Sequence, residues 1–331
     1  MEFGIQLSNH ELARYRDLAQ EAEGLGFNLV TTPDHIAHER AGVPFDPHHL
    51  AYDPMLIAAV MADATKRIRV GHLVLCNLFR HPVMTAQSLS SLDHLAGGRM
   101  IAGLGTGWTE TEFRMTGIPF PDVKTRLEVL DEALTCMRSL WTNERTTFAG
   151  RHYRFDDAIL WPKPIGRMPI LVGGSGKGLL RVAAKHADVV NIIADMGRAG
   201  RVSASELRKV TGEVYRQKIA FLREEAGRVG RDPGSIRVSS VIFSIFLVDS
   251  TAAAVRTAER LAPVFETTPD LVRHSPLALV GTSEECAVEL QRRIREWGVE
   301  QFIFSGGAFS VMRRLREEVL AHVDPRQSAA E

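Results

Sequence analysis

Short apolar segments alternate with longer amphipathic segments along the whole chain. Residues 3–7 form a compact apolar run, and in residues 11–25 apolar side chains recur on one face of a predicted helix. The same alternation continues toward the C-terminus. It predicts eight strands, at 3–7, 27–32, 68–75, 100–104, 169–172, 187–193, 236–248 and 301–305.

The segments between these strands carry helical patterns and helix-end signals. Thr282 and Glu285 form a capping box, and Gly298 ends the helix that follows. Residues 105–124 and 142–168 are predicted as loops. The other helices are predicted at 11–25, 54–64, 82–95, 125–141, 177–186, 203–228 and 311–322.

Strands that each lead into a helix indicate a parallel α/β fold, because consecutive parallel strands need a crossover connection. Eight such units predict a (β/α)8 TIM barrel, with a doubly wound open sheet as the alternative. No linker rich in Gly, Ser or Pro divides the chain, so residues 1–331 are predicted to form a single domain. The length beyond a minimal barrel falls in insertions near 36–52, 142–168 and 195–231, which are candidate lids over one face.

The charge balance and the cysteines exclude several classes of protein. Forty basic and forty acidic residues give a formal net charge of zero, which excludes a protein-wide basic field for nucleic acid. Cys76, Cys136 and Cys286 lack zinc-ligand spacing and suit a reducing compartment. The N-terminus has no leader pattern, and the longest apolar run, 238–248, is too short to span a membrane. We therefore expect a soluble, cytoplasmic protein.

In such barrels the active site lies at the carboxyl ends of the strands. The strand 169–172 ends in Gly173-Gly174-Ser175-Gly176-Lys177-Gly178, which opens a helix. Glycines there let backbone N–H groups approach an anion at the positive end of the helix dipole, which predicts phosphate binding. The alternative is an ordinary glycine-rich connection, since this loop matches neither the Walker motif nor GxGxxG.

Two further strand ends carry candidate chemistry. Gly103, Gly105 and Gly107 lie at the end of the strand 100–104, where glycines can admit a flat ring against the backbone. His35 follows the strand 27–32 beside Asp34, where an imidazole can act as a general acid or base, or simply bond to a loop carbonyl.

Other titratable residues suggest weaker hypotheses. His38, His48 and His49 lie near Asp34 and Asp46, but their irregular spacing argues against a metal site. Glu110 and Glu112 are either acid–base carboxylates or the acidic first turn of a helix, and the second interpretation is favoured.

Several blocks together resemble the luciferase-like monooxygenase superfamily, in particular its coenzyme F420-dependent oxidoreductases. The blocks occur in the family's order along nearly the whole chain. They are Arg69–Leu75 with Arg80-His81-Pro82, Ser91–Leu95, Gly97–Arg99, Gly103–Trp108, Arg126–Trp141, Pro169–Asp188 and Leu279–Thr282.

The resemblance implies a flavin-like ring across the strands 68–75 and 100–104, with a non-proline cis bond at Leu73–Val74 behind the ring. It implies proton transfer by His35 and a substrate pocket formed by His38, Phe79 and Trp108. The cofactor-binding residues that it implies are Asp34, Leu73, Val74, Asn77, Gly105, Thr106, Gly107, Gly173, Gly174, Ser175, Gly176 and Lys177.

The cofactor is predicted to be coenzyme F420, a deazaflavin that carries hydride and has an acidic tail, with FMN as the alternative. An acidic tail favours a basic rim around the phosphate loop. The residues predicted to form this rim are Lys163, Arg167, Lys177, Arg181 and Lys185. The chain departs from the family's sugar-phosphate dehydrogenases at Trp108, where they have a catalytic glutamate.

The sequence thus predicts an F420-dependent oxidoreductase that acts on a small organic substrate. An FMN-dependent monooxygenase and a cofactor-free binding or subunit-partner protein are the alternatives. Charge and hydropathy predict neither a nucleic acid nor a membrane as partner, and the resemblance implies a homodimer.

Overall fold

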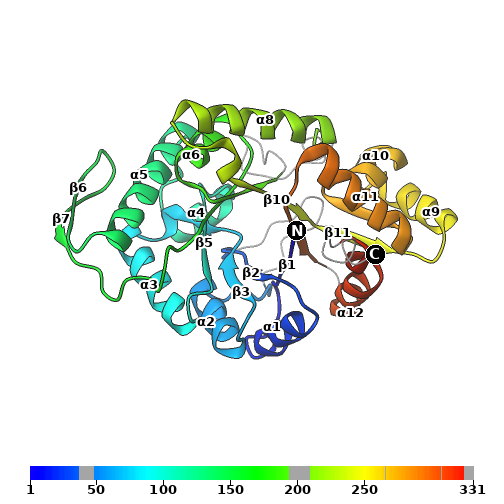
Figure 1. Ribbon diagram of the computed structural model, residues 1–331, viewed down its shortest axis with the longest axis horizontal. Coiled ribbons are helices and arrows are strands. Elements are labelled where there is room, and N and C mark those ends of the chain that lie inside the picture. The colour runs from blue at the N-terminus through cyan, green and yellow to red at the C-terminus, as the bar shows by residue number, and fades with distance from the viewer. Residues whose placement is uncertain (37–47, 194–208, 265, 307, 324–331) are drawn as a thin grey trace.

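The computed structural model describes residues 1–36, 48–193, 209–264, 266–306 and 308–323. Parallel strands form a closed barrel. β1 (Glu2–Gln6) pairs with both β2 (Leu29–Thr32) and β13 (Gln301–Ser305), and the ring of strands closes where Val70 and Gly71 pair with Met100 and Ile101. This closure confirms the predicted TIM barrel and excludes the open sheet (Figure 1). The remaining strands are β3 (Arg69–His72), β4 (Leu75–Cys76), β5 (Met100–Gly105), β8 (Ile170–Gly173), β9 (Val189–Ile192) and β10 (Arg237–Ile242).

Strands β3 and β4 occupy one position in the barrel. Val70 of β3 pairs with Met100 of β5, and further along Leu75 of β4 pairs with Leu104 of the same strand. The predicted strand 68–75 is therefore interrupted at residues 73 and 74. That interruption is the cis peptide bond Leu73–Val74, as the family resemblance implied.

Helices surround the strands, and local signals set their ends. The Asp53 side chain accepts a hydrogen bond from the Met55 N–H at the start of α2, and the Thr282–Glu285 capping box begins α11. Gly298 ends α11 in the left-handed conformation, as predicted. The helices of this ring are α1 (Arg14–Gly24), α2 (Pro54–Ala64), α3 (Pro82–Leu95), α5 (Val123–Thr142), α6 (Lys177–His186), α8 (Gly212–Arg228), α11 (Ser283–Trp297) and α12 (Phe309–Arg314).

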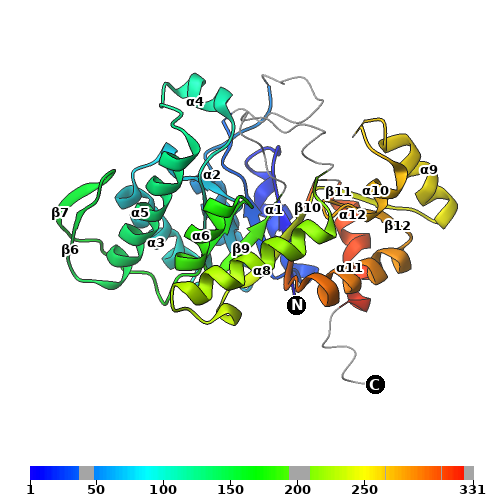
Figure 2. The same ribbon diagram turned by 90° about the horizontal axis from the view of Figure 1, so that it is seen from above.

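The two segments predicted as loops contain regular structure. Residues 105–124 include the helix α4 (Glu110–Thr116), which stands away from the ring of helices in Figure 2. Residues 142–168 include a hairpin, β6 (Thr146–Ala149) and β7 (Arg154–Ala158). The Glu132 carboxylate of α5 accepts hydrogen bonds from three backbone N–H groups at the hairpin tip, residues 151–153. Such a distant contact has no local sequence signal.

The C-terminal third also differs from the prediction. The single strand expected at 236–248 is two strands, β10 and β11 (Ser244–Leu247), and β11 pairs with β12 (Ala278–Gly281) outside the barrel. The helices α9 (Thr251–Leu261) and α10 (Pro269–His274) precede β12 and had no predicted counterpart. The last predicted helix is α12 followed by a π-helical turn, Leu315–Val319, and a 3-10 turn, Leu320–His322. Of the predicted helix 203–228, residues 203–208 lie outside the described residues.

A small apolar cluster fills the barrel interior, separate from the larger core between strands and helices. Its buried members come from five strands, and Leu73 and Val74 pack against it. They are Leu29, Ile101, Leu171, Val189 and Ile303. This cluster makes the barrel a packed core, and in such barrels a ligand binds at the carboxyl ends of the strands.

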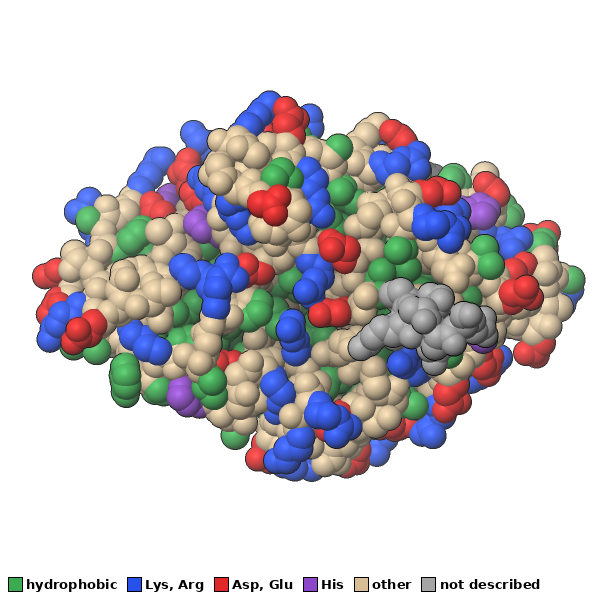
Figure 3. Space-filling model, viewed as in Figure 1, with side chains coloured by type: hydrophobic (Ala, Val, Ile, Leu, Met, Phe, Trp, Pro, Cys, Tyr) green, Lys and Arg blue, Asp and Glu red, His purple; other side chains and the backbone are tan. Residues whose placement is uncertain are grey.

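Acidic and basic side chains are interspersed on the surface shown in Figure 3, consistent with the zero net charge. Among the described residues, no helix combines the length and hydropathy that a membrane-spanning segment requires.

We predict that Gly103→Ala disrupts folding. A Cβ at position 103 would lie 1.7 Å from the His72 carbonyl oxygen, which is backbone and cannot move without distorting the barrel. Gly166→Ala is the matched control, since a Cβ there meets nothing within 4 Å. In urea unfolding, Gly103→Ala should lose about 3 kcal/mol or more, or give no folded protein, and Gly166→Ala should stay within about 0.5 kcal/mol of wild type. Equal stability of the two variants would contradict this packing.

Candidate active site

A cavity of about 1270 Å³ opens at the carboxyl ends of the barrel strands. The ends of β1, β4, β5, β8, β9, β10 and β13 all contribute to its wall. It is the location that the barrel geometry predicts for an active site.

The Leu73–Val74 segment forms part of the cavity wall and is held by the neighbouring strands. The Gln6 side-chain amide donates to the Leu73 carbonyl at 2.8 Å, and the Leu73 N–H donates to the Thr32 carbonyl at 3.0 Å. A Cβ on Gly105 would lie 2.7 Å from Val74 Cγ2, and one on Gly173 would lie 2.8 Å from Val74 Cγ1. The two glycines thus make room for Val74. This packing requirement is a second reason for glycine at position 105, and the predicted contact of Gly105 with a ring stays a prediction.

The glycine-rich loop after β8 leads into α6 as predicted. No side chain caps α6, so the N–H groups of its first turn are available to an anion. Ser175 is buried in this loop, and its Oγ has no hydrogen-bond partner in the described structure. From α8, the Lys218 ammonium donates to the Ser175 carbonyl at 2.8 Å and fixes the loop. A buried hydroxyl without a partner beside uncapped helix N–H groups fits a phosphate ligand.

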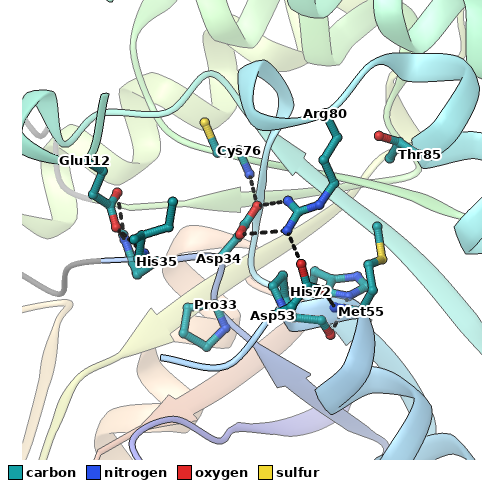
Figure 4. Close-up of polar contacts among 12 residues, drawn as sticks. Pro33, Asp34, His35, Asp53, Met55, His72, Cys76, Arg80, Thr85 and Glu112 are labelled. Atoms are coloured by element: carbon teal, nitrogen blue, oxygen red, sulfur yellow. Dashed lines mark hydrogen bonds and ion pairs between the residues drawn. The ribbon is translucent and has the colours of Figure 1, made fainter. Parts of the chain in front are cut away.

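A buried carboxylate connects the end of β2 to the segment after β4. Asp34 Oδ2 accepts a hydrogen bond from the Cys76 N–H at 2.9 Å and from Arg80 at 2.6 Å. Arg80 also contacts Asp53, at the start of α2, at 2.8 Å (Figure 4). Burial raises the pKa of the Asp34 carboxyl, whereas the charge of Arg80 and its hydrogen bond lower it. The Arg80 guanidinium therefore ties the end of β2 and the start of α2 to the segment after β4.

His35 is in direct contact with a second carboxylate in the cavity wall. Its Nδ1 lies 3.1 Å from Glu112 Oε1 and 3.2 Å from Oε2, and the Ile36 N–H donates to Oε1 at 2.6 Å (Figure 4). Glu112 belongs to α4 and its side chain is 4% exposed. The carboxylate holds the Nδ1–H tautomer, which directs Nε2 away from Glu112. The Trp108 ring packs edge-on against the imidazole, with centroids 5.6 Å apart.

The interpretation of Glu112 as only the acidic first turn of a helix is wrong. Glu110 and Glu112 do occupy the first turn of α4, but Glu112 is buried against His35 while Glu110 is exposed. The contact spans 77 positions in sequence, so no local pattern indicates it. The pairing of Arg80 with Asp34 and Asp53 was likewise not predicted, because the sequence places Arg80 only within a block that resembles the family.

Most of the predicted site residues do line the cavity. The residues that do so are Asp34, His35, Leu73, Val74, Gly105, Thr106, Gly107, Trp108, Gly173, Gly174, Ser175, Gly176 and Lys177. Their roles toward a ligand stay predictions.

The remaining predicted site residues lie elsewhere. Asn77 is buried outside the cavity wall, with its Nδ2 unpartnered in the described structure. Phe79 lines a smaller neighbouring cavity of about 380 Å³, together with Arg80 and Tyr52. His38 lies outside the described residues.

The predicted basic rim is wrong in extent. Lys163 donates to the carbonyls of Leu140 and Asn143, and Arg167 pairs with Asp188 before β9, at the other end of the barrel. Of the five predicted residues only Lys177 lines the cavity. Lys124 and Arg126 of α5 join it there, next to the acidic residues Glu128 and Asp131.

The cavity does not present an activated thiol or a metal-binding cluster in the described part of the chain. Burial raises the pKa of the Cys76 thiol to about 12, so this cavity-lining thiol stays protonated. No group of three or more His, Cys, Asp or Glu side chains is arranged for a metal ion among the residues that the structure describes.

Comparison with known proteins agrees with this geometry. Residues 1–301 match the sequence profile of the luciferase-like monooxygenase family, and the chain belongs to that family.

Several curated relatives carry the name F420-dependent glucose-6-phosphate dehydrogenase. The one from Intrasporangium calvum is 33% identical over 231 residues, which cover 66% of each chain. The one from Nakamurella multipartita is 34% identical over 57% of this chain and 55% of its own length. The one from Kineococcus radiotolerans is 27% identical over 87% of this chain and 81% of its own length. The match thus covers 66% of the length of the Intrasporangium calvum relative and 55% of the length of the Nakamurella multipartita relative, which is less than two thirds of either protein.

Solved structures share the fold at lower identity. The coenzyme F420-dependent tetrahydromethanopterin reductase from Methanopyrus kandleri superposes with a TM-score of 0.75 at 18% identity, covering 98% of this chain and 99% of that one. A monooxygenase from Streptomyces bottropensis superposes with a TM-score of 0.76 at 22% identity, covering 99% of this chain and 100% of that one.

We predict that Arg80→Gln destabilises the protein by about 3 kcal/mol, because it leaves the buried Asp34 carboxylate without its cation. Arg16→Gln is the matched control. Arg16 pairs with Asp63 at 2.8 Å, but both side chains are about half exposed. That substitution should change the unfolding free energy by less than about 1 kcal/mol in urea titrations. Similar losses for the two variants would show that Asp34 does not depend on Arg80.

Proposed function

We propose that this protein is an F420-dependent oxidoreductase that acts on a small organic substrate. The observation that carries the proposal is the buried, unpartnered Ser175 Oγ beside the uncapped start of α6, at one end of a cavity walled by the Leu73–Val74 bulge. The names of the relatives support a deazaflavin as the occupant.

The residues present fit that cofactor. Ser175 and the first-turn N–H groups of α6 would hold its phosphate, and Lys124, Arg126 and Lys177 supply positive charge on the same side of the cavity. Leu73, Val74, Gly105 and Thr106 form the nearby wall and would bound its ring. When bound, a deazaflavin supplies two-electron hydride transfer and reacts poorly with oxygen.

The chain's own residues supply the proton chemistry. Oxidation of an alcohol removes the carbon-bound hydrogen as hydride and releases the hydroxyl proton. Reduction of a carbonyl adds a hydride to the carbon and a proton to the oxygen. His35 lines the cavity, and the contact of its Nδ1 with Glu112 fixes its tautomer and the orientation of its ring. His35 therefore exchanges the proton with the substrate oxygen, and Glu112 is a positioning residue.

We do not extend the sugar-phosphate specificity named for the relatives to this chain. The catalytic glutamate of those enzymes has its counterpart, by resemblance, at Trp108, and in this chain the Trp108 ring packs against His35. A large apolar ring beside the proton-transfer group favours a less polar substrate.

Cofactor binding tests the proposal directly. Purified protein titrated with F420 and with FMN, followed by fluorescence, should bind F420 saturably and FMN at least about tenfold more weakly.

Ser175→Ala should weaken F420 binding about tenfold, because a hydrogen bond to a charged group is lost. Ser91→Ala is the control, since Ser91 lies on the exposed face of α3. Preference for FMN would support the monooxygenase instead, and binding of neither cofactor would refute both.

The roles of His35 and Glu112 are tested by kinetics on a substrate found by screening alcohols and ketones. His35→Gln should lower kcat about 100-fold and Glu112→Gln about tenfold, with F420 affinity within about twofold of wild type. Glu110→Gln, on the exposed face of the same helix, should leave kcat unchanged. If Glu112→Gln had the kcat of Glu110→Gln, Glu112 would not position the imidazole.

A further inference from the structure

The charged and the uncharged walls of the large cavity come from two different parts of the described chain. Every Asp, Glu, Lys, Arg and His that lines it among the described residues lies between positions 34 and 177. The described lining residues from 191 to 306 carry no charge. Most of them come from the ends of β9, β10 and β13, from Val264 and from residues 267–278, which include α10, and we call this part of the cavity the apolar arm.

The surface of the apolar arm is hydrophobic where it opens to solvent. Phe243, Val264 and Leu271 line it and are 41%, 67% and 41% exposed. Val272 and Leu277 are buried beneath them. Exposed apolar side chains that gather at the mouth of a cavity indicate a binding surface for an apolar group. In Figures 1 and 2, α9 and α10 lie at the end of the molecule opposite the β6–β7 hairpin, so this surface is far from that insertion.

Among the uncharged polar side chains of the apolar arm, one hydroxyl points to a ligand because it is buried without a partner. Thr267 lines the cavity, and its Oγ1 is buried without a hydrogen-bond partner in the described structure. A hydroxyl is a neutral donor and acceptor, so it suits an alcohol, ketone or ether oxygen. It does not compensate the charge of a phosphate or carboxylate, which needs a cation or several N–H groups.

The anionic parts of the cofactor belong to the other side of the cavity. Lys124, Arg126, Lys177 and the start of α6 are all located there. An acidic group in the apolar arm would lose its hydration without gaining a positive partner among the described residues. The apolar arm is therefore the part of the cavity that remains for the substrate, and it belongs to the same cavity as His35.

We propose that the substrate is an uncharged, mainly hydrophobic alcohol or carbonyl compound, whose apolar portion lies in the apolar arm against Phe243, Val264 and Leu271. This proposal rests on the proposed function for the reaction but not for the binding surface. It excludes sugar phosphates, the substrates named for the relatives above.

The binding surface is tested without cofactor by the fluorescence of Nile red, a neutral apolar probe. The wild-type protein should bind it, and Val264→Asp and Leu271→Asp should each weaken binding about tenfold, because a carboxylate is placed in an apolar site. Val288→Asp is the matched control, since Val288 is 55% exposed on α11 and does not line the cavity. Circular dichroism should show all three variants folded, because Val264, Leu271 and Val288 are each at least 41% exposed.

Competition then identifies the chemical class. Hexanol, octanol and decanol should displace Nile red with affinity that rises about fourfold for each added CH₂, whereas glucose 6-phosphate should not displace it. Displacement by glucose 6-phosphate, or equal loss of binding in Val264→Asp and Val288→Asp, would overturn the proposal.

The failure of this proposal can be told apart from the failure of the proposed function. If Nile red binds as described but F420 does not, the oxidoreductase is refuted while the apolar arm stands as a binding surface. If F420 binds but Nile red does not, the apolar arm is refuted and the oxidoreductase stands.

Discussion

The buried Asp34 carboxylate is the interaction on which the candidate site depends. It joins the end of β2 to the Cys76 N–H and to Arg80, and Arg80 in turn reaches Asp53 at the start of α2. A carboxylate on a residue that is 5% exposed stays charged only if cations and N–H donors replace its water, so these partners are obligatory. His35 is the next residue along the chain. The position of its imidazole opposite Glu112 is therefore set by an ion pair that does not itself contact Glu112.

Three glycines leave the space that the backbone and side chain around Leu73–Val74 occupy. Gly103 admits the His72 carbonyl, and Gly105 and Gly173 admit the Val74 side chain, so three glycines from two neighbouring strands serve one irregularity. The bulge rests on the apolar cluster inside the barrel and presents its other side to the cavity. The same arrangement leaves the charged α5 and α6 termini on one side and the uncharged residues after 191 on the other. A two-part ligand set, anionic cofactor and neutral substrate, fits this division.

The repeating pattern of strands and helices predicted the barrel because periodicity and capping are local properties. The strand 301–305 and the helix 177–186 match β13 and α6 at both ends. The glycine loop and His35 could be found for the same reason, since a barrel places every strand end on one face. The pairing of Glu112 with His35, the anchoring of the hairpin by Glu132 and the extra strand pair β11–β12 could not, because each depends on residues far apart in the chain. The basic rim failed because spacing alone does not show that Arg167 faces Asp188 at the opposite end of the barrel.

The most direct test of the central claim is a crystal structure of the protein in complex with F420. The ligand phosphate should lie within hydrogen-bond distance of Ser175 Oγ and the first-turn N–H groups of α6, with the deazaflavin ring against Val74 and the acidic tail toward Lys124 and Lys177. The part of the cavity bounded by Phe243, Val264 and Leu271 should remain open for substrate. A phosphate located away from Ser175, or a cofactor tail that occupies the region of Leu271, would contradict the assignment of the two sides of the cavity.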